Sequence, residues 1–295
     1  MRSARWLVPV LSVSVGFVSL AVHAQGRRRG AAVPTATRTP AAGATVLRYS
    51  YVAGERARYV SRQAQHAPTP AGDTRSTSHI EIETVSVGAD GVARLRMRMV
   101  DLDVQSAAIT PDVRQQINRG IGGMALTYSQ DARGHVSARG GATGVSAEFQ
   151  PLVDGLMQSL DQMSPSFPAT PVAVGGTWSD HRTLQMNLMP GVALGMELDL
   201  SYTLREVRSA PTGQVVVLAC TVGMRLNPGT AAGGVSFRGE GQATGDMTLD
   251  MAHGQIISTR SQGHMQMHVS VNGRNTDVPS RFENEMVREG APATP

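Results

Sequence analysis

Long runs of alternating apolar and polar side chains fill the sequence between about residues 46 and 288. In the clearest run, residues 95–99, leucine and methionine alternate with arginine, and residues 196–204, 247–251 and 265–271 repeat the pattern. A period of two is typical of a β-strand with one buried face. Several runs reach on the order of 10–15 residues, beyond the usual five or six. We therefore expect a mainly β (β-rich α+β) fold, built on a long antiparallel curved sheet or half-barrel.

Short turns rich in glycine separate these runs. Gly88–Gly91, Asp131–Gly134, His253-Gly254 and Asn272-Gly273 each stand between two apolar runs. Consecutive strands joined by such turns pair antiparallel. After Met99 the apolar positions move by one residue, which predicts a β-bulge at Met99-Val100.

Two segments predict helices. Thr110-Pro111-Asp112 combines an N-cap residue, proline in the first turn and an acidic side chain at the N-terminus, and the helix should end by 120–123. The segment 149–163 has one apolar stripe over four turns. One or two amphipathic helices should therefore pack on the concave face of the sheet. The stripe consists of Phe149, Leu152, Val153, Leu156, Met157, Leu160 and Met163.

Residues 1–24 predict a secretory signal peptide. Arg2 and Arg5 precede an apolar stretch, and Val22-His23-Ala24 fits a cleavage site following Ala24. Gln25 stands where a lipoprotein would need cysteine. We expect an exported protein, periplasmic or extracellular, that is soluble and has no stable membrane insertion.

The remaining chain divides by composition. The Gly/Ala/Pro/Arg-rich residues 25–45 predict a disordered linker, and 289–295 a disordered tail. Residues 46–288 predict a single β-rich domain, with a division into two similar halves meeting near 165–175 left open. Without the five arginines of the first 29 residues, 22 arginines face 23 acidic residues. This balance argues against nucleic acid as a partner.

Two stretches resemble an uncharacterised family of bacterial exported proteins. The first is Leu47–Tyr51, followed by Gly54-Glu55 and Arg58-Tyr59; the second is Phe167-Pro168, followed by 171–178 (PVAVGGTW). The resemblance covers roughly residues 46–288. The resemblance implies that the domain spans these residues and that the protein is exported. The family has no established activity, so no catalytic residues can be assigned by the resemblance.

The sequence contains no catalytic motif that we recognise. It has no Gly-x-Ser-x-Gly, no His-Glu-x-x-His and no lysine for a phosphate-binding loop. The single cysteine, Cys220, stands in an apolar run and predicts an inert buried thiol. We expect a protein that is not an enzyme and needs no cofactor. A hydrolase with a dispersed site, such as His181 with Asp180 or Asp199, remains an alternative.

A second alternative is a periplasmic copper site at residues 264–268. His264, Met265, Met267 and His268 offer the soft ligands that exported copper proteins use. On a strand, however, the histidines and the methionines project to opposite faces. The methionines also continue an apolar register, which favours a structural role for them.

The function that these patterns favour is an exported, non-catalytic envelope protein. It would bind a lipid or other apolar small molecule, or another envelope component. A fully packed core without a binding site is the competing interpretation. The side chains expected to face an apolar ligand are Leu152, Leu156, Met157, Leu160, Met196, Leu198, Met265 and Met267.

Overall fold

The computed structural model of the chain describes residues 43–68, 72–146, 150, 153, 164–189, 192–211, 213–227, 235–271 and 274–290. These residues form one eleven-stranded antiparallel sheet in the order β5-β4-β3-β2-β1-β11-β10-β9-β8-β7-β6. The prediction of a mainly β fold with a long antiparallel curved sheet is confirmed.

The elements are, in chain order, β1 (Arg56–His66), β2 (Thr74–Val87), β3 (Ala93–Ser106), α2 (Pro111–Ile121), β4 (Ala125–Gln130), β5 (Val136–Arg139), β6 (Thr177–Met189), β7 (Val192–Ala210), β8 (Gly213–Asn227), β9 (Val235–Asp250), β10 (Gln255–Val271) and β11 (Arg274–Arg288). Most strands run 11 to 19 residues.

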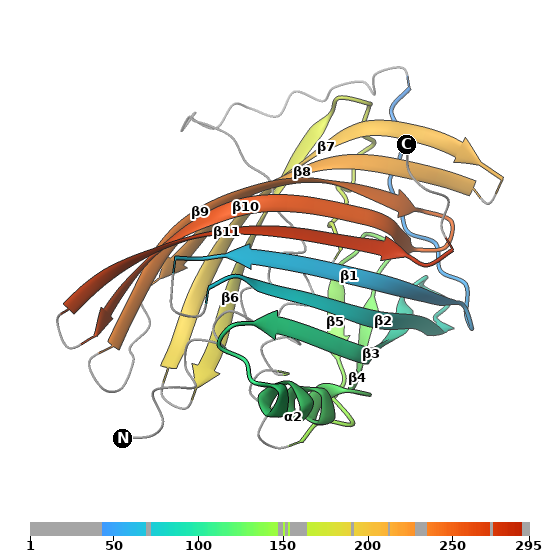
Figure 1. Cartoon of the computed structure of the whole chain (residues 1–295). Helices are drawn as coiled ribbons and strands as arrows, with labels where there is room; N and C mark the ends of the chain where they lie inside the picture. Colours follow the sequence, from blue (N-terminus) through green and yellow to red (C-terminus); the bar gives the residue numbers. More distant parts are fainter. Residues whose placement is uncertain are drawn as a thin grey trace.

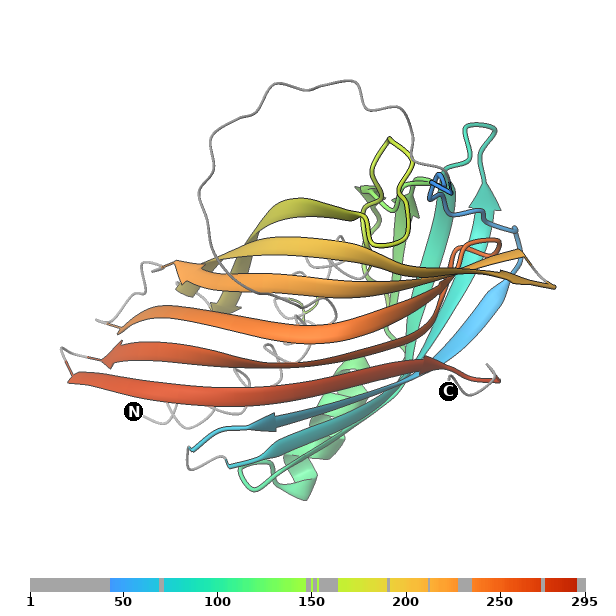
Figure 2. The same cartoon turned by 90° about the horizontal axis from the view of Figure 1, so that it is seen from above.

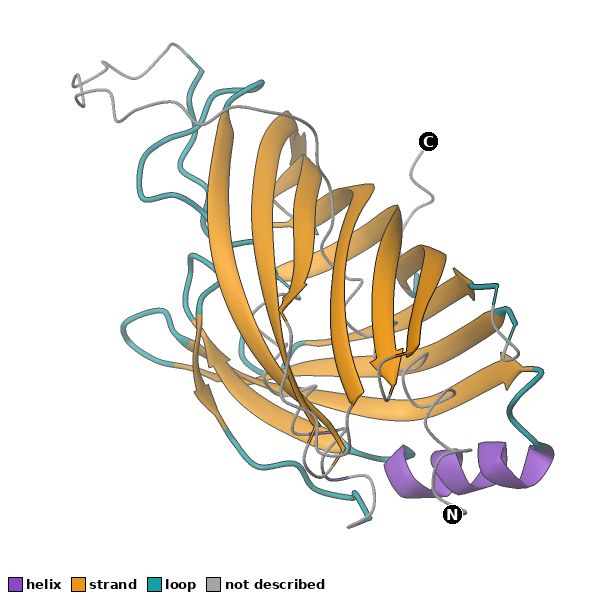
Figure 3. Ribbon diagram, turned by 90° about the vertical axis from the view of Figure 1, so that its left-hand side faces the viewer, coloured by secondary structure: helices purple, strands orange, loops and turns teal. Residues whose placement is uncertain are grey.

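The sheet consists of two meanders, β1–β5 and β6–β11, joined by antiparallel pairing of the first strand with the last. Its two edges, β5 and β6, are consecutive in the sequence. Figure 1 shows the central strands in front, with β4, β5 and β6 behind them. Figures 2 and 3 show the same bend from two other sides, so the sheet is an open half-barrel with a concave and a convex face.

A polar cluster supports the junction of β1 with β11. The Arg288 guanidinium donates to Gln255 Oε1 at 2.7 Å, and its Nη1 lies 3.4 Å from Asp250 Oδ2. Asp250 Oδ1 lies 2.9 Å from His253 Nδ1, and His253 Nε2 lies 3.6 Å from Glu55 Oε1. The start of β1, the end of β11 and the β9–β10 turn are thus held together.

The predicted bulge after Met99 is confirmed. Ile80 pairs with Met99 and His79 with Asp101, so Val100 is the extra residue of β3. Before it, Met97 and Met99 are buried, and after it Leu102 and Val104 are buried. The bulge therefore keeps both halves of the strand facing the core.

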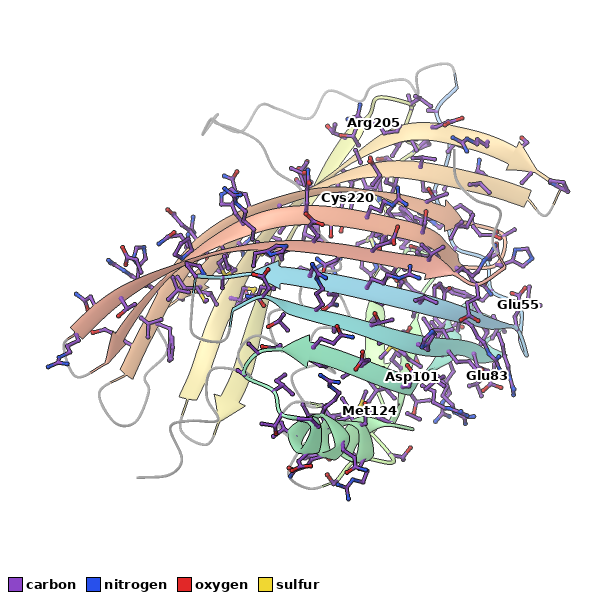
Figure 4. The ribbon with its side chains drawn as sticks, viewed as in Figure 1. Glu55, Glu83, Asp101, Met124, Arg205 and Cys220 are labelled. Carbon is purple, nitrogen blue, oxygen red and sulfur yellow. The ribbon has the colours of Figure 1, made fainter. Side chains whose placement is uncertain are left out.

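The convex face is charged, and its acidic and basic side chains pair across neighbouring strands. Glu83 accepts from Arg56 at 3.0 Å and from Arg96 at 3.3 Å. Glu285 lies between Arg260 and Arg62 in the same way. Figure 4 labels Glu83 and Asp101 of this face. Each exposed pair adds little stability, about 0–1 kcal/mol, but together they fix which face meets water.

Glycines permit the bend at β9 and β10. A Cβ on Gly245 would collide with the carbonyl oxygen of Arg260, and a Cβ on Gly263 with the Ala243 side chain and the Phe282 ring. Phe282 pairs with Gly263 across β10–β11 and is itself buried. Its ring takes the space that the missing side chain leaves.

Helix α2 confirms the first predicted helix. Thr110 is its N-cap and accepts from the amide of Val113, and Pro111 opens the first turn. Ile121 is buried, and Val113 and Ile117 pack against the core. In Figure 1 the helix lies beside the ends of β3 and β4. Of the second predicted helix, 149–163, only Gln150 and Val153 are described, and Val153 is buried.

Gly263→Ala should lower the free energy of unfolding by about 1–3 kcal/mol, because the added methyl group overpacks a bent part of the sheet. Urea unfolding followed by circular dichroism measures the change. Gly141→Ala is the control, since a Cβ there meets nothing within 4 Å and Gly141 is exposed. Equal midpoints for the two variants would contradict this account of the bend.

Candidate functional site on the concave face

An aromatic cluster occupies one end of the concave face. Tyr49 and Phe167 have ring centroids 4.8 Å apart, and Trp178 stacks on Tyr202 at 5.4 Å. Phe167 links the two pairs, with its centroid 6.3 Å from that of Trp178. Such contacts add about 0.5–1.5 kcal/mol per pair beyond the buried area. We call this end the closed end.

An extended segment, residues 45–52, runs along the closed end. Thr45 and Val172 exchange backbone hydrogen bonds of 2.9 and 2.8 Å. The amide of Tyr49 donates to Ala132 O, and that of Ser50 to Met251 O. The segment therefore ties the chain before β6 to the β4–β5 and β9–β10 turns, which predicts a rigid base for the concave face.

The β4–β5 turn depends on Asp131. Its Oδ1 accepts from the amides of Arg133 and His135 at 2.8 and 2.9 Å, and its Oδ2 lies 3.0 Å from His135 Nδ1. Partial burial raises the pKa of this carboxyl, but the hydrogen bonds from His135 and the two amides outweigh burial, so the pKa lies below its usual value. From the same turn, Arg133 donates to Phe167 O at 2.9 Å.

Beyond the aromatic cluster, two apolar walls line the concave face. One wall comes from β7 and β8, and the other from β3 and β4. Methionine and leucine dominate both, and every member is nearly inaccessible to solvent. The wall residues are Met97, Met99, Leu102, Leu126, Met196, Leu198, Leu200, Val222, Met224 and Leu226.

The structure places the predicted ligand-facing residues in two groups. Met196, Leu198 and Met265 are buried at 1–2% exposure on the concave face, and Met267 is half-buried there. Met196 pairs with Leu226 and Leu198 with Met224, so the β7–β8 wall is continuous. The other four predicted residues, Leu152, Leu156, Met157 and Leu160, lie outside the described residues.

Uncharged polar side chains occupy the floor between the walls, and the sequence analysis did not single them out. They lie on the four central strands, β2, β1, β11 and β10, at positions that alternate with charged convex-face residues. Only the register between distant strands brings them together, so no local motif signals them. We call this set the polar floor: Ser76 and Ser78, Ser61, Gln63 and Gln65, Ser280 and Asn284, and Thr259 and Ser261.

One charged pair stands on the β6 part of the concave face. The guanidinium of Arg182 donates to Asp180 Oδ2 and to Ser166 Oγ, both at 2.9 Å. Its Nη1 is buried and makes no hydrogen bond to the described residues. The Arg182 side chain is only 11% exposed. This wall thus offers a hydrogen-bond donor beside Leu198, the cross-strand partner of Arg182.

The end opposite the aromatic cluster is less covered. Phe237 and Met267 pack against the core but are only partly buried. Val269, which pairs with Phe237, and Val278, which pairs with Met267, are also half-buried. We call this the open end, where apolar side chains of the concave face meet solvent.

The residues of the copper alternative are divided between the two faces. His264 is exposed on the convex face, whereas Met265 is buried on the concave face. His268 Nδ1 lies 2.6 Å from Asp277 Oδ1. In the described part of the chain, no group of three His, Cys, Asp or Glu side chains is placed to hold a metal ion.

The residues of the hydrolase alternative are also divided. His181 Nδ1 lies 2.8 Å from Asp199 Oδ1, and both side chains are more than half exposed on the convex face. Asp180 points to the concave face, where it pairs with Arg182. A pair this exposed lacks the buried environment that is typical of catalytic groups.

The prediction of a buried thiol is confirmed at Cys220. It lies on β8 (labelled in Figure 4), pairs with Tyr202 and Gly245, and is 4% exposed. Burial, with a smaller contribution from Asp246, raises the pKa of the Cys220 thiol to about 12. The thiol is therefore protonated at neutral pH and a poor nucleophile.

Comparison with known proteins identifies no family. No family model and no curated protein matches the chain. A solved structure of lipovitellin, described for its lipid–protein interactions, is similar at 12% identity and a TM-score of 0.47, over 83% of this chain and 26% of that one. A Bacteroides fragilis protein with a YmcC-like fold is similar at 12% identity and a TM-score of 0.25, over 83% and 98%.

These likenesses are too distant to carry a functional argument. The chain spans about a quarter of the lipovitellin chain that it matches. Among the described residues, no helix has the length and apolar character needed to cross a membrane.

Asp131→Asn should destabilise the protein at pH 7 and matter progressively less as the pH falls. The carboxyl has a lowered pKa in the folded state, so its contribution is present above the unfolded-state pKa, about 4, and is lost as the pH falls through the folded value. Thermal unfolding of both proteins between pH 7 and pH 2 checks this. A difference that stays constant over that range would contradict the assignment.

Proposed function

We propose that this protein is an exported, non-catalytic carrier that binds an acyl chain or similar apolar ligand on its concave face. The observation that supports the proposal best is the opposite character of the two faces. Arginine–glutamate pairs cover the convex face, whereas methionine and leucine walls line the concave face. The sheet therefore gathers its buried hydrocarbon side chains on one side only.

The composition of the walls suits a flexible hydrocarbon chain. Methionine is unbranched and polarisable, and therefore adapts to ligands of different shapes. Each methylene group transferred from water to such a surface contributes about 0.8 kcal/mol. An acyl chain of sixteen carbons could thus offset the cost of ordering it and still bind in the micromolar range or tighter.

The two ends of the face suggest how a chain would enter. Aromatic rings and the segment 45–52 cover the closed end. At the open end, Phe237 and Met267 are partly exposed apolar side chains on the same face. Entry from the open end would bring the hydrocarbon along the walls towards the aromatic cluster.

Export is part of the proposal. The signal peptide predicted at residues 1–24 would deliver the protein to the periplasm or the medium. There, a lipid released from a membrane needs an apolar surface to cross water. A carrier needs no catalytic group for this task.

A fluorescent acyl probe tests the proposal directly. The mature chain, stripped of bound lipid by organic extraction and refolding, should bind the probe with micromolar or lower Kd. Bound probe should stabilise the folded state by RT ln(1 + [L]/Kd), so the Tm should rise with probe concentration. Native mass spectrometry of the unstripped protein should reveal a co-purified apolar molecule. No probe binding, no change in Tm and a consistently empty protein would overturn the proposal.

Met265→Gln provides the matched variant. It replaces a buried concave-face side chain by a polar one of similar length and should weaken probe binding about tenfold, because the amide would be buried without partners. Gln262→Met, on the exposed side of the same strand, is the control. Urea unfolding shows whether either variant still folds, and equal probe affinities in two folded variants would contradict a concave-face site.

A further inference from the structure

The two outer edges of the sheet differ greatly in length. β5 has four residues, whereas β6 has thirteen. Sheet edges are commonly protected from pairing with another chain by being short, or by lysine and proline, and β6 has none of these features. Within the described residues, no backbone hydrogen bond from a turn or loop reaches residues 177–189. β6 therefore presents a long edge to which a further strand could be added.

The backbone groups of β6 alternate between its two sides. The amide of Leu204, on β7, donates to Gly176 O just before β6 begins, so the even-numbered residues that follow direct their backbone groups towards β7. The odd-numbered residues direct theirs outward. Ser179, His181 and Thr183 are therefore the outward positions, and all three are exposed. An added strand would form its hydrogen bonds with them.

The charged residues on the concave side of this edge restrict which strand fits. Asp180 and Arg182 form a 2.8 Å ion pair within one copy. If His181 lies opposite His181 of a second, antiparallel copy, Asp180 of each copy lies opposite Arg182 of the other. Moving the two-fold axis by one residue in either direction would place Asp180 opposite Asp180, or Arg182 opposite Arg182. Opposite charges across strands stabilise a pair and like charges destabilise it.

Inward charges on an edge strand usually discourage pairing. Here they discourage the two neighbouring registers and favour the register between them. The segment Asp180–Arg182 is thus complementary to itself, which points to a second copy of this chain as the partner.

We propose that β6 is a dimerisation edge, at which two copies of the chain pair antiparallel about a two-fold axis at His181. Residues that lie opposite each other in this register occupy the same face, so both concave faces stay on one side of a continuous sheet. A two-fold contact uses the same edge of both copies and therefore stops at the dimer. The inference does not depend on the carrier function.

A disulfide at the axis tests the register. Outward residues directly opposite each other have Cα atoms about 5.5 Å apart, inside the range of about 4.4–6.8 Å that a disulfide spans. His181→Cys should therefore cross-link two copies under mild oxidation, measured by non-reducing electrophoresis. The native thiol of Cys220 is buried and does not compete.

Ser179→Cys is the matched control on the same edge. Position 179 lies opposite Thr183 of the second copy, so two thiols at position 179 would be offset by four residues, about 13 Å along the strand. Ser179→Cys alone should cross-link at least tenfold more slowly than His181→Cys. A mixture of Ser179→Cys with Thr183→Cys should cross-link as a heterodimer. Equal rates for His181→Cys and Ser179→Cys would overturn the register.

Sedimentation equilibrium tests the association itself. The unmodified mature chain should show a monomer–dimer equilibrium over micromolar concentrations. Ser179→Pro removes an outward amide without touching the β6–β7 ladder and should weaken the dimer at least tenfold, whereas Ser179→Ala keeps the amide and should not. A mature chain that stays monomeric, or a folded Ser179→Pro variant that dimerises as well as Ser179→Ala, would overturn the proposal. If Ser179→Pro does not fold, the cross-linking rates still decide.

Discussion

The pairing of the first strand with the last holds this molecule together. Without the β1–β11 ladder, from Tyr59–Arg288 to His66–Arg281, the chain would form two separate meanders, each with two unpaired edges. With it, eleven strands share one bend, and β5 and β6 remain as the edges. The cluster of Arg288, Asp250 and His253 beside this ladder holds the adjoining turn in place.

Apolar and polar side chains alternate along each strand and so lie on opposite faces of the sheet. The bend makes the apolar face concave and the charged face convex. Arginine and glutamate meet across strands on the outside, and methionine and leucine gather inside. Small residues at Gly245 and Gly263 permit the curvature, and Phe282 fills the space beside them. The polar floor then interrupts the apolar interior at its centre, so the concave face is itself divided between hydrocarbon and hydrogen-bonding chemistry.

Much of the fold could be predicted from local patterns, and much of the site could not. The period of two identified the strands, the phase change at Met99 identified the bulge, and Thr110-Pro111 identified α2. Local patterns also predicted that Met196 and Leu198 lie on the buried face of their strand, and both are buried. Strand order is a non-local property, however, so neither the β1–β11 pairing nor the meeting of Gln63 with Asn284 follows from spacing. The alternation along residues 56–66 indicates which face of its strand Gln63 occupies. It does not indicate which residues of other strands lie beside Gln63.

The β1–β11 ladder also governs the order in which the protein can be assembled. A chain synthesised from its N-terminus presents β1 more than 200 residues before β11 exists. Until then, one backbone edge of β1 and the concave side chains of the first meander have no partner. Formation of that last ladder requires contacts between the most distant parts of the chain, which makes folding slow. The chain is therefore most prone to aggregation before the β1–β11 ladder forms. A factor that covers the unpaired edge of the first meander during that time would favour correct folding.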